Sequence, residues 1–315
     1  PLTGAENESL GMLLMIEDIS SEKRMKSTMS RYMDADLADQ LLEAGDGDDM
    51  MGGKESIGTV LFSDIRSFTT LTESLGAQGT VGFLNDYFTI MVDCIQAEGG
   101  MLDKFIGDAI MAIFGTPVAH DDDPDRGLRA AIQMMVGLNE FNVLRKSKGL
   151  PPVDHGMGLN TDQIVSGNIG SPKRMDYTVI GDGVNLAARV ESSCKKYGAH
   201  ILMSEHTFHA LKATYRTRQI DMVVVKGKTV PVGVYEVLDY HTKETFPNMI
   251  EVLEMFNNGI EYYNEGNWDK AIAQFKKAQK GNPDDKCSNM YVERCDILKK
   301  RDPKDWDGVW VATSK

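Results

Sequence analysis

The sequence predicts an α+β fold, a mixed sheet covered by helices, on three observations. Between residues 55 and 240, apolar runs of strand length alternate with stretches of helical periodicity. Two of these runs are joined by Gly107-Asp108, a pair typical of a tight hairpin turn. A second hairpin is indicated by VVVKGKTVPVGVYEV, residues 223–237. The order of elements, βαββαβ, is typical of a ferredoxin-like arrangement.

Each element of this region has its own local signal. The apolar run IGTVLFSDI, residues 57–65, predicts a strand that ends in an acid, and a helix follows through residues 80–99. After the first hairpin, Asp123-Pro124 predicts a helix start and Pro151-Pro152 ends that helix. Two strands are expected to flank Gly167. A further strand, DYTVIGD, then leads into a helix over residues 183–198.

The regions on either side have a different character. Residues 1–19 are interpreted as the end of an upstream sensor-like module, and residues 20–54 as a coupling helix followed, from residue 44, by a flexible linker. That helix could pair with a second copy of itself or pack on its own domain. Because the chain starts at Pro1 without a signal-peptide pattern, it is interpreted as a fragment of a larger protein.

The segment at residues 246–300 is expected to be helical. Gly259, Tyr262 and Phe275 lie at spacings typical of one tetratricopeptide repeat, in which small residues let two helices approach while Tyr262 and Phe275 fill the groove. Such arrays need about three repeats to be stable. The segment is therefore expected to pack on the preceding domain or to continue in a segment absent from this chain.

Composition and charge exclude some classes of function. A formal net charge of -13 argues against a nucleic-acid or anionic-membrane surface, since those partners select basic patches. No apolar run approaches the roughly 18 residues of a membrane-spanning helix. The four cysteines lack CxxC spacing, which fits a reducing cytosol. These observations predict a soluble, cytoplasmic chain with no membrane segment.

Two carboxylates stand at the ends of apolar strands. Asp64 ends the strand at residues 57–65, and Asp108 lies in the first hairpin turn, so one edge of a sheet could hold both. Paired carboxylates there suit hard divalent cations such as Mg²⁺ or Mn²⁺. Either aspartate alone would more often be a turn former. The residues after Asp64 lead to a helix start, which could cradle phosphate oxygens or simply cap the helix.

Four motifs carry a resemblance to a known family. They are, in order, FSDIRSFT, LDKFIGDAIMAIFG, RMDYTVIGDGVNLAAR and VKGK. Together they resemble the catalytic domain of class III nucleotidyl cyclases in the adenylyl branch, and the flanks look most similar to cyanobacterial receptor-type adenylyl cyclases. Any one motif would be a weak signal, whereas four in order are specific. The resemblance implies that ATP is converted to 3′,5′-cyclic AMP and pyrophosphate by two-metal-assisted attack of the ribose 3′-hydroxyl on the α-phosphate.

The resemblance also assigns roles to site residues. Asp64, Asp108 and the carbonyl of Ile65 would hold two divalent cations, Mg²⁺ or Mn²⁺. Lys104 and Thr178 would read the base: the ammonium donates to adenine N1, and the hydroxyl accepts from the exocyclic amine. Guanine presents a carbonyl and a ring N–H instead, which would favour an acidic residue at position 104. The pair therefore favours ATP over GTP.

The remaining roles concern the ribose and the phosphates. Asn185 and Arg189 lie four residues apart on one helix, so they project from one face. The resemblance implies that Asn185 orients the ribose and that Arg189 stabilises charge on the α-phosphate. The other candidates would contact substrate phosphates: Ser67, Phe68, Thr69, Arg174 and Lys226.

In this family the active site spans two chains, one supplying the metal ligands and the other the base, ribose and phosphate contacts. Because this sequence holds both sets, the resemblance implies a homodimer with two shared sites. The Lys and Thr pair also resembles the branch stimulated by bicarbonate. Three alternatives stay open: a catalytically weak regulatory nucleotide-binding domain, a guanylyl cyclase, and an interaction scaffold acting through the helical tail.

Overall fold

The computed structural model describes residues 2–3, 9–11, 53–171, 173–224 and 231–310. The chain divides into two units, Pro1–Gly47 and Asp48–Lys315. In the first unit the described part is a short pairing of β1 (Leu2–Thr3) with β2 (Ser9–Gly11). The predicted coupling helix, and the linker as far as residue 52, lie outside the described residues.

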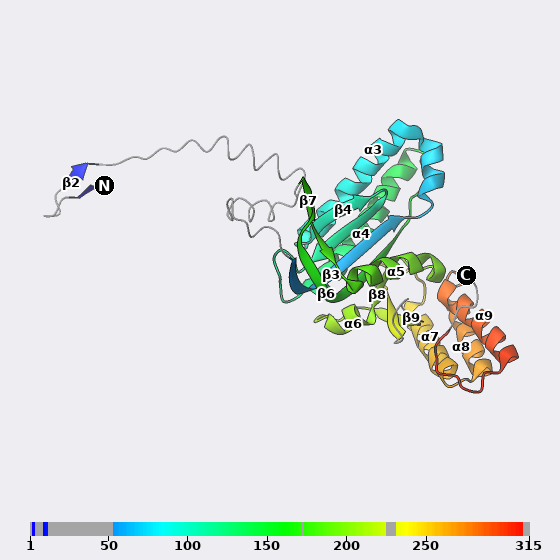
Figure 1. Ribbon diagram of the computed structural model, residues 1–315. Helices are drawn as coiled ribbons and strands as arrows, with labels where there is room; N and C mark the ends of the chain where they lie inside the picture. Colours follow the sequence, from blue (N-terminus) through cyan, green and yellow to red (C-terminus); the bar gives the residue numbers. More distant parts are fainter. Residues whose placement is uncertain (1, 4–8, 12–52, 172, 225–230, 311–315) are drawn as a thin grey trace. The chain divides into compact units, whose positions relative to one another are not determined.

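The second unit is built on an eight-stranded mixed sheet (Figure 1). Its strands are β3 (Gly53–Ile65), β4 (Met101–Ile106), β5 (Ala109–Phe114), β6 (His155–Ser171), β7 (Arg174–Ile180), β8 (Ile201–Ser204), β9 (Thr217–Val224) and β10 (Pro231–Val237). They follow the order β4-β5-β3-β6-β8-β10-β9, with β7 paired to β6. The β6–β8 pair is parallel, and the other pairs of this sheet are antiparallel. The predicted α+β class is confirmed.

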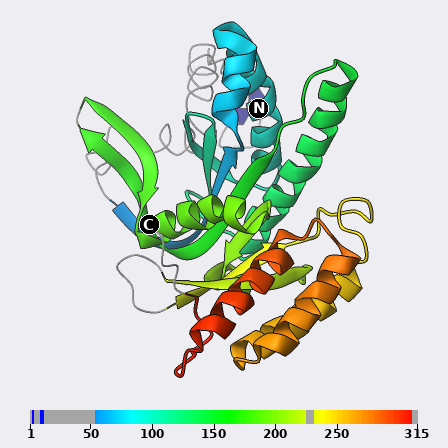
Figure 2. The same cartoon turned by 90° about the vertical axis from the view of Figure 1, so that its right-hand side faces the viewer.

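Helices cover both faces of this sheet (Figure 2). They are α3 (Phe68–Ala97), α4 (Asp123–Ser147), α5 (Asp182–Tyr197), α6 (Glu205–Ala210), α7 (Met249–Asn264), α8 (Trp268–Gly281) and α9 (Lys286–Arg301). Side chains alternate between faces along a strand, so β3 shows which helix covers which face. Leu61 and Ile65 pack in a cluster with α3 and α4, whereas Val60 packs with Ala187 of α5.

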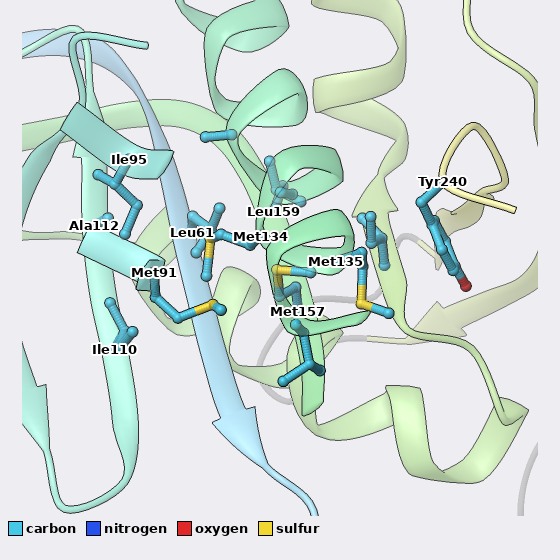
Figure 3. Close-up of a cluster of buried hydrophobic side chains, with 14 of the residues drawn as sticks. Leu61, Met91, Ile95, Ile110, Ala112, Met134, Met135, Met157, Leu159 and Tyr240 are labelled. Carbon is cyan, nitrogen blue, oxygen red and sulfur yellow. The ribbon is translucent and has the colours of Figure 1, made fainter. Parts of the chain in front are cut away.

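The core between the sheet and α3 and α4 is built largely from methionine and aliphatic side chains. Figure 3 shows Met91 and Ile95 of α3 facing Leu61 of β3 and Ile110 of β5. Unbranched methionine fills irregular gaps between helices and sheet. This packing anchors β3 and β5, the two strands whose ends carry Asp64 and Asp108.

Three element boundaries differ from the prediction. Strand β3 begins at Gly53, inside the predicted linker, because Gly53 pairs with Gly167 of β6. Helix α3 begins at Phe68, well before residue 80, and contains a non-helical break at Gly76. Gly167 lies inside β6 and not between two strands, since residues 165–171 go on to pair with β7. The predicted helices after Asp123-Pro124 and after DYTVIGD are confirmed.

The hairpin of β4 and β5 is confirmed as well. Ile106 pairs with Ala109, which leaves Gly107 and Asp108 as a two-residue turn. Gly107 has a φ of 68°, a conformation that glycine adopts without the strain of a side chain. The register shifts between Leu102 and Lys104, so that residue 103 forms a bulge in the edge strand. Bulges re-aim the side chains next to them, here those of residues 103 and 104.

The three C-terminal helices pack on the sheet, one of the two arrangements expected from sequence. Phe256, Phe275 and Tyr291 share a buried cluster with Leu186 of α5 and Ile220 of β9. Of the two expected groove fillers, Phe275 is fully buried, whereas Tyr262 is partly buried against the same cluster and its neighbour Tyr263 lies in the core. The match to a tetratricopeptide repeat stays a prediction. Among all the described residues, no helix is long and apolar enough to span a membrane.

Buried ion pairs join this tail to the sheet. The Arg294 guanidinium of α9 donates to both carboxylate oxygens of Asp221 in β9, at 3.0 and 2.6 Å. Both side chains are almost fully buried, and the Tyr197 hydroxyl at the end of α5 also donates to Asp221 at 2.5 Å. Removing either partner of such a buried pair lowers the stability of the fold, because the remaining charge stays buried without its counter-ion. Asp221 of β9 thus binds both the tail, through Arg294, and the end of α5, through Tyr197.

Replacing Arg294 with methionine is expected to lower the free energy of unfolding by about 3 kcal/mol, since Asp221 would stay buried without its main counter-ion. Urea denaturation measures this change. The control is Lys299→Met on the same helix, whose exposed pair with Asp269 should change stability by less than about 0.5 kcal/mol. Equal effects of the two variants would show that the Arg294–Asp221 pair does not hold the tail.

Candidate active site

Two carboxylates meet where β3 ends and the β4–β5 hairpin turns. Strands β3 and β5 are paired as far as Ser63 and Ile110, which brings Asp64 and Asp108 together. Burial, and then the adjacent charge of Asp64, raise the pKa of Asp108 to about 6, although N–H groups of Ile65 and Asp108 itself oppose this shift. Within the described part of the chain, neither carboxylate has a salt bridge. The predicted pairing of the two aspartates at one edge is therefore present.

This carboxylate pair fits a divalent cation. Two half-buried like charges without a counter-ion repel each other, and a hard cation with oxygen ligands relieves that repulsion. Among the described residues, no group of three or more His, Cys, Asp or Glu side chains is arranged for a metal. Further ligands would then come from backbone carbonyls, water or substrate phosphates, as is usual for Mg²⁺.

Arg66, a residue of the FSDIRSFT motif with no predicted role, fixes the position of this end of β3. Its Nη1 donates to Asp154 at 3.0 Å, its second amino group donates to the carbonyl of Ala199, and its backbone N–H donates to the carbonyl of Asp154. These bonds tie the residue after Ile65 to the segments before β6 and β8. The Ile65 backbone is therefore held in one place.

The helix start after Arg66 has an unusual geometry. Ser67 has a φ of 56°, a left-handed conformation that costs energy for a residue other than glycine, and its side chain makes no capping bond. Ser67 and Thr69 are exposed and Phe68 is half-buried. The first N–H groups of α3 thus begin two residues after Arg66, at Phe68, at the positive end of a helix dipole. This is the position expected for the phosphate contacts.

The predicted base-reading residues come together through a carboxylate that the sequence analysis missed. The Thr178 hydroxyl of β7 donates to Asp103 at 3.0 Å, and the Lys104 ammonium lies 3.4 Å from the same oxygen. The Asp103 side chain is fully buried, Thr178 is nearly so, and Lys104 is 40% exposed. Residue 103 is the bulged residue, which explains how two successive side chains of β4 meet.

Helix α5 lies unusually close to β6. A Cβ on Gly158 would come within 2.1 Å of the Glu191 backbone nitrogen, so a larger residue there would push the helix away. Asn185 and Arg189 are exposed on the outer side of α5, one turn apart as predicted. Among the residues that the structure describes, the Arg189 guanidinium makes no ion pair.

The other side of α5 faces the carboxylate pair of the same chain. Glu191 Oε1 lies 3.3 Å from the position that a Cβ on Gly156 would take, and Gly156 pairs with Asp64, so α5 directs Glu191 towards the pair. Burial, and then the charge of Asp64, raise the pKa of Glu191 to about 7. Arg189 is two residues earlier, about 200° round the helix, and so points away from it. The sequence places Glu191 on the opposite side of α5 from Arg189. It does not show which of these two sides faces the sheet, so Glu191 could not be predicted as a site residue.

The two remaining candidates are less informative. Arg174 is exposed at the start of β7. Lys226 lies in residues 225–230, outside the described residues, between β9 and β10.

A family model described as the adenylate and guanylate cyclase catalytic domain matches residues 52–243. The chain belongs to this family. The match covers β3 to β10, so the carboxylate pair, Lys104, Thr178 and α5 all lie within the cyclase domain. The helices α7 to α9 lie beyond it.

Individual relatives agree with the family match. The chain is 35% identical over 243 residues to the adenylate cyclase, terminal-differentiation specific, of Dictyostelium discoideum, covering 75% of this chain and 11% of that protein. It is 41% identical over 186 residues to an adenylate cyclase of Anabaena cylindrica, covering 57% of this chain and 36% of that protein. The chain thus spans only a small part of these relatives.

Solved structures of both kinds of cyclase are similar to this chain. The adenylyl cyclase CyaB from P. aeruginosa is 35% identical with a TM-score of 0.56, covering 60% of this chain and 97% of that one. The guanylyl cyclase Cya2 is 38% identical with a TM-score of 0.54, covering 59% of this chain and 94% of that one. Similar scores for both mean that overall similarity does not decide the base that this cyclase uses.

Proposed function

We propose that this chain is an adenylyl cyclase, the output domain of a signalling protein, which converts ATP to 3′,5′-cyclic AMP and pyrophosphate. Membership of the cyclase family and the relatives named adenylate cyclase support the reaction class. The observation that carries the choice of ATP is the position of Lys104 and Thr178 on one buried carboxylate, Asp103. That arrangement offers a donor and an acceptor side by side, the complement of the adenine edge.

In the proposed reaction the ribose 3′-oxygen forms a bond to the α-phosphorus, the bond to pyrophosphate breaks, and the 3′-hydroxyl proton is released. Asp64, Asp108 and the Ile65 carbonyl would hold two divalent cations, Mg²⁺ or Mn²⁺. When bound, such cations lower the pKa of the hydroxyl and neutralise phosphate charge. Asn185 would orient the ribose, and Arg189 would stabilise negative charge on the α-phosphate.

The proposed active enzyme is a homodimer with two shared sites. In one chain α5 directs Glu191 towards the carboxylate pair and the exposed Arg189 away from it, so Arg189 is oriented to serve the pair of a second chain. Exposed apolar side chains also accompany the base-reading residues, a feature typical of an interface. They are Phe105, Ile106, Met175 and Ile180.

Stimulation by bicarbonate and a scaffold role for the tail have less support. Stimulation by bicarbonate rests on the resemblance alone. A scaffold acting through the tail would need a free apolar face, but most large apolar side chains of α7, α8 and α9 lie in a buried cluster shared with α5 and the sheet. Ile250 and Ile297 are exposed, but they lie on different helices. Adenylyl cyclase activity is therefore the better supported function.

We expect the protein to form cyclic AMP from ATP much faster than cyclic GMP from GTP, with Mg²⁺ or Mn²⁺. The double substitution Lys104→Glu with Thr178→Cys should raise the ratio of kcat/KM for GTP over ATP by about 100-fold or more, because a site built to hydrogen-bond one base leaves polar groups unpaired with another. Both products are measured for both substrates. The control is Lys148→Glu, an exposed lysine after α4 that carries the same charge change. An unchanged ratio in the double variant would refute the base-reading pair.

A further inference from the structure

Asp103 occupies an unusual position for a carboxylate. It is the bulged residue of the edge strand β4, its side chain is fully buried, and one oxygen, Oδ1, has no hydrogen-bond partner among the described residues. Its other oxygen, Oδ2, meets the Thr178 hydroxyl at 3.0 Å and the Lys104 ammonium at 3.4 Å. A buried carboxylate is costly unless it is paired, so Asp103 depends on these two side chains.

The bond to Thr178 fixes the direction of its hydroxyl proton. An ionised carboxylate can only accept hydrogen bonds, so the hydroxyl must donate to it. The lone pairs of the Thr178 oxygen are then the only hydrogen-bonding capacity left for a ligand. Without Asp103 the same hydroxyl could rotate and donate to the ligand instead, as serine and threonine hydroxyls do when unconstrained.

We propose that Asp103 is a positioning residue for base selection: it holds the Thr178 hydroxyl as an acceptor and Lys104 beside it as a donor, and so rejects guanine. This inference rests on the proposed base-reading role of Lys104 and Thr178. Adenine presents an amine that donates to Thr178 and a ring nitrogen, N1, that accepts from Lys104. Guanine presents an acceptor, O6, to an oxygen that cannot donate, and an N1–H to an ammonium that cannot accept. With guanine, two acceptors face each other at Thr178 and two donors face each other at Lys104, so neither hydrogen bond forms.

The test compares three substitutions of Asp103. Leucine has nearly the shape of aspartate but accepts no hydrogen bond, alanine removes the group altogether, and asparagine keeps an acceptor oxygen. The ratio of kcat/KM for ATP over GTP is expected to fall about 10- to 100-fold in Asp103→Leu and Asp103→Ala, and to be largely restored in Asp103→Asn. If the leucine variant does not fold, the alanine variant provides the measurement. Alanine is smaller and β4 is an edge strand with one neighbouring strand, so this change should disturb the sheet less.

A double-mutant cycle separates positioning from a general structural effect. In a Thr178→Val background there is no hydroxyl to orient, so Asp103→Leu or Asp103→Ala should change the ratio much less, through its contact with Lys104 alone. The matched control is Asp176→Asn, which removes an exposed carboxylate two residues before Thr178 and should leave the ratio unchanged.

Three results would overturn the inference. They are an unchanged ratio in both Asp103→Leu and Asp103→Ala, a full loss of selectivity in Asp103→Asn, and an undiminished effect in the Thr178→Val background. If the Lys104→Glu, Thr178→Cys variant shifts the ratio while the Asp103 variants do not, only the role of Asp103 fails. If none of these variants shifts it, the base-reading pair itself fails.

Discussion

Alanine at position 64 or 108 is expected to abolish cyclic AMP formation, with a loss of at least about 10³-fold in kcat. Each change removes half of the carboxylate pair that would bind the divalent cations, and no other acidic cluster in the described ranges replaces it. Activity is measured with saturating ATP and with Mg²⁺ and Mn²⁺ in turn. Titration of Mn²⁺ by electron paramagnetic resonance provides a second readout, because weaker cation binding should accompany the loss of turnover.

The stability of the Asp64→Ala and Asp108→Ala variants shows whether a loss of activity comes from unfolding. Burial and the charge of Asp64 disfavour the charged form of Asp108, so removing one of the two charges relieves repulsion in the cation-free protein. The urea midpoint should therefore be unchanged or higher, and the exposed Asp93→Ala on α3 should behave as the unaltered protein. Substantial residual activity with Mn²⁺ binding intact would refute the assignment of Asp64 and Asp108.

Two inactive chains are expected to restore activity when mixed. Asp108→Ala lacks a metal ligand and Arg189→Ala lacks the phosphate contact, and a mixed dimer contains one site with both defects and one intact site. With random assembly, half of the dimers are mixed, so activity should recover to about a quarter of the unaltered level. Recovery is expected because α5 directs Glu191 towards the carboxylate pair of its own chain and Arg189 away from it.

The mixing experiment has a strict control. Asp64→Ala mixed with Asp108→Ala should stay inactive, because both defects fall on the same half of the site and every mixed dimer then carries two damaged sites. Mixed dimers are verified with two different affinity tags. Failure to recover activity despite verified mixed dimers would contradict the shared site, as would recovery in the control.

Much of the fold could be predicted because its signals are local. The Gly107-Asp108 turn needs a residue that tolerates positive φ, and Asp123-Pro124 is a strong helix start. The boundaries of β3, α3 and β6 could not be predicted in the same way. Gly53 and Gly167 belong to strands only because a partner strand lies beside each of them. Tertiary pairing outweighs the weak propensity of glycine.

The candidate site also has a part that the sequence predicted and a part that it did not. The residue types and their order by themselves determined the family resemblance and the candidates Asp64, Asp108, Lys104, Thr178 and Arg189, since the chemistry of metal and base binding needs those side chains. Only the tertiary structure decided which of them meet. It brought Asp103 between Lys104 and Thr178, 75 residues from the latter, and directed Glu191 and not Arg189 towards Asp64. The physical reason is that a bulge in β4 and the close approach of α5 to Gly158 set the direction of these side chains, and both depend on contacts between segments far apart in the chain.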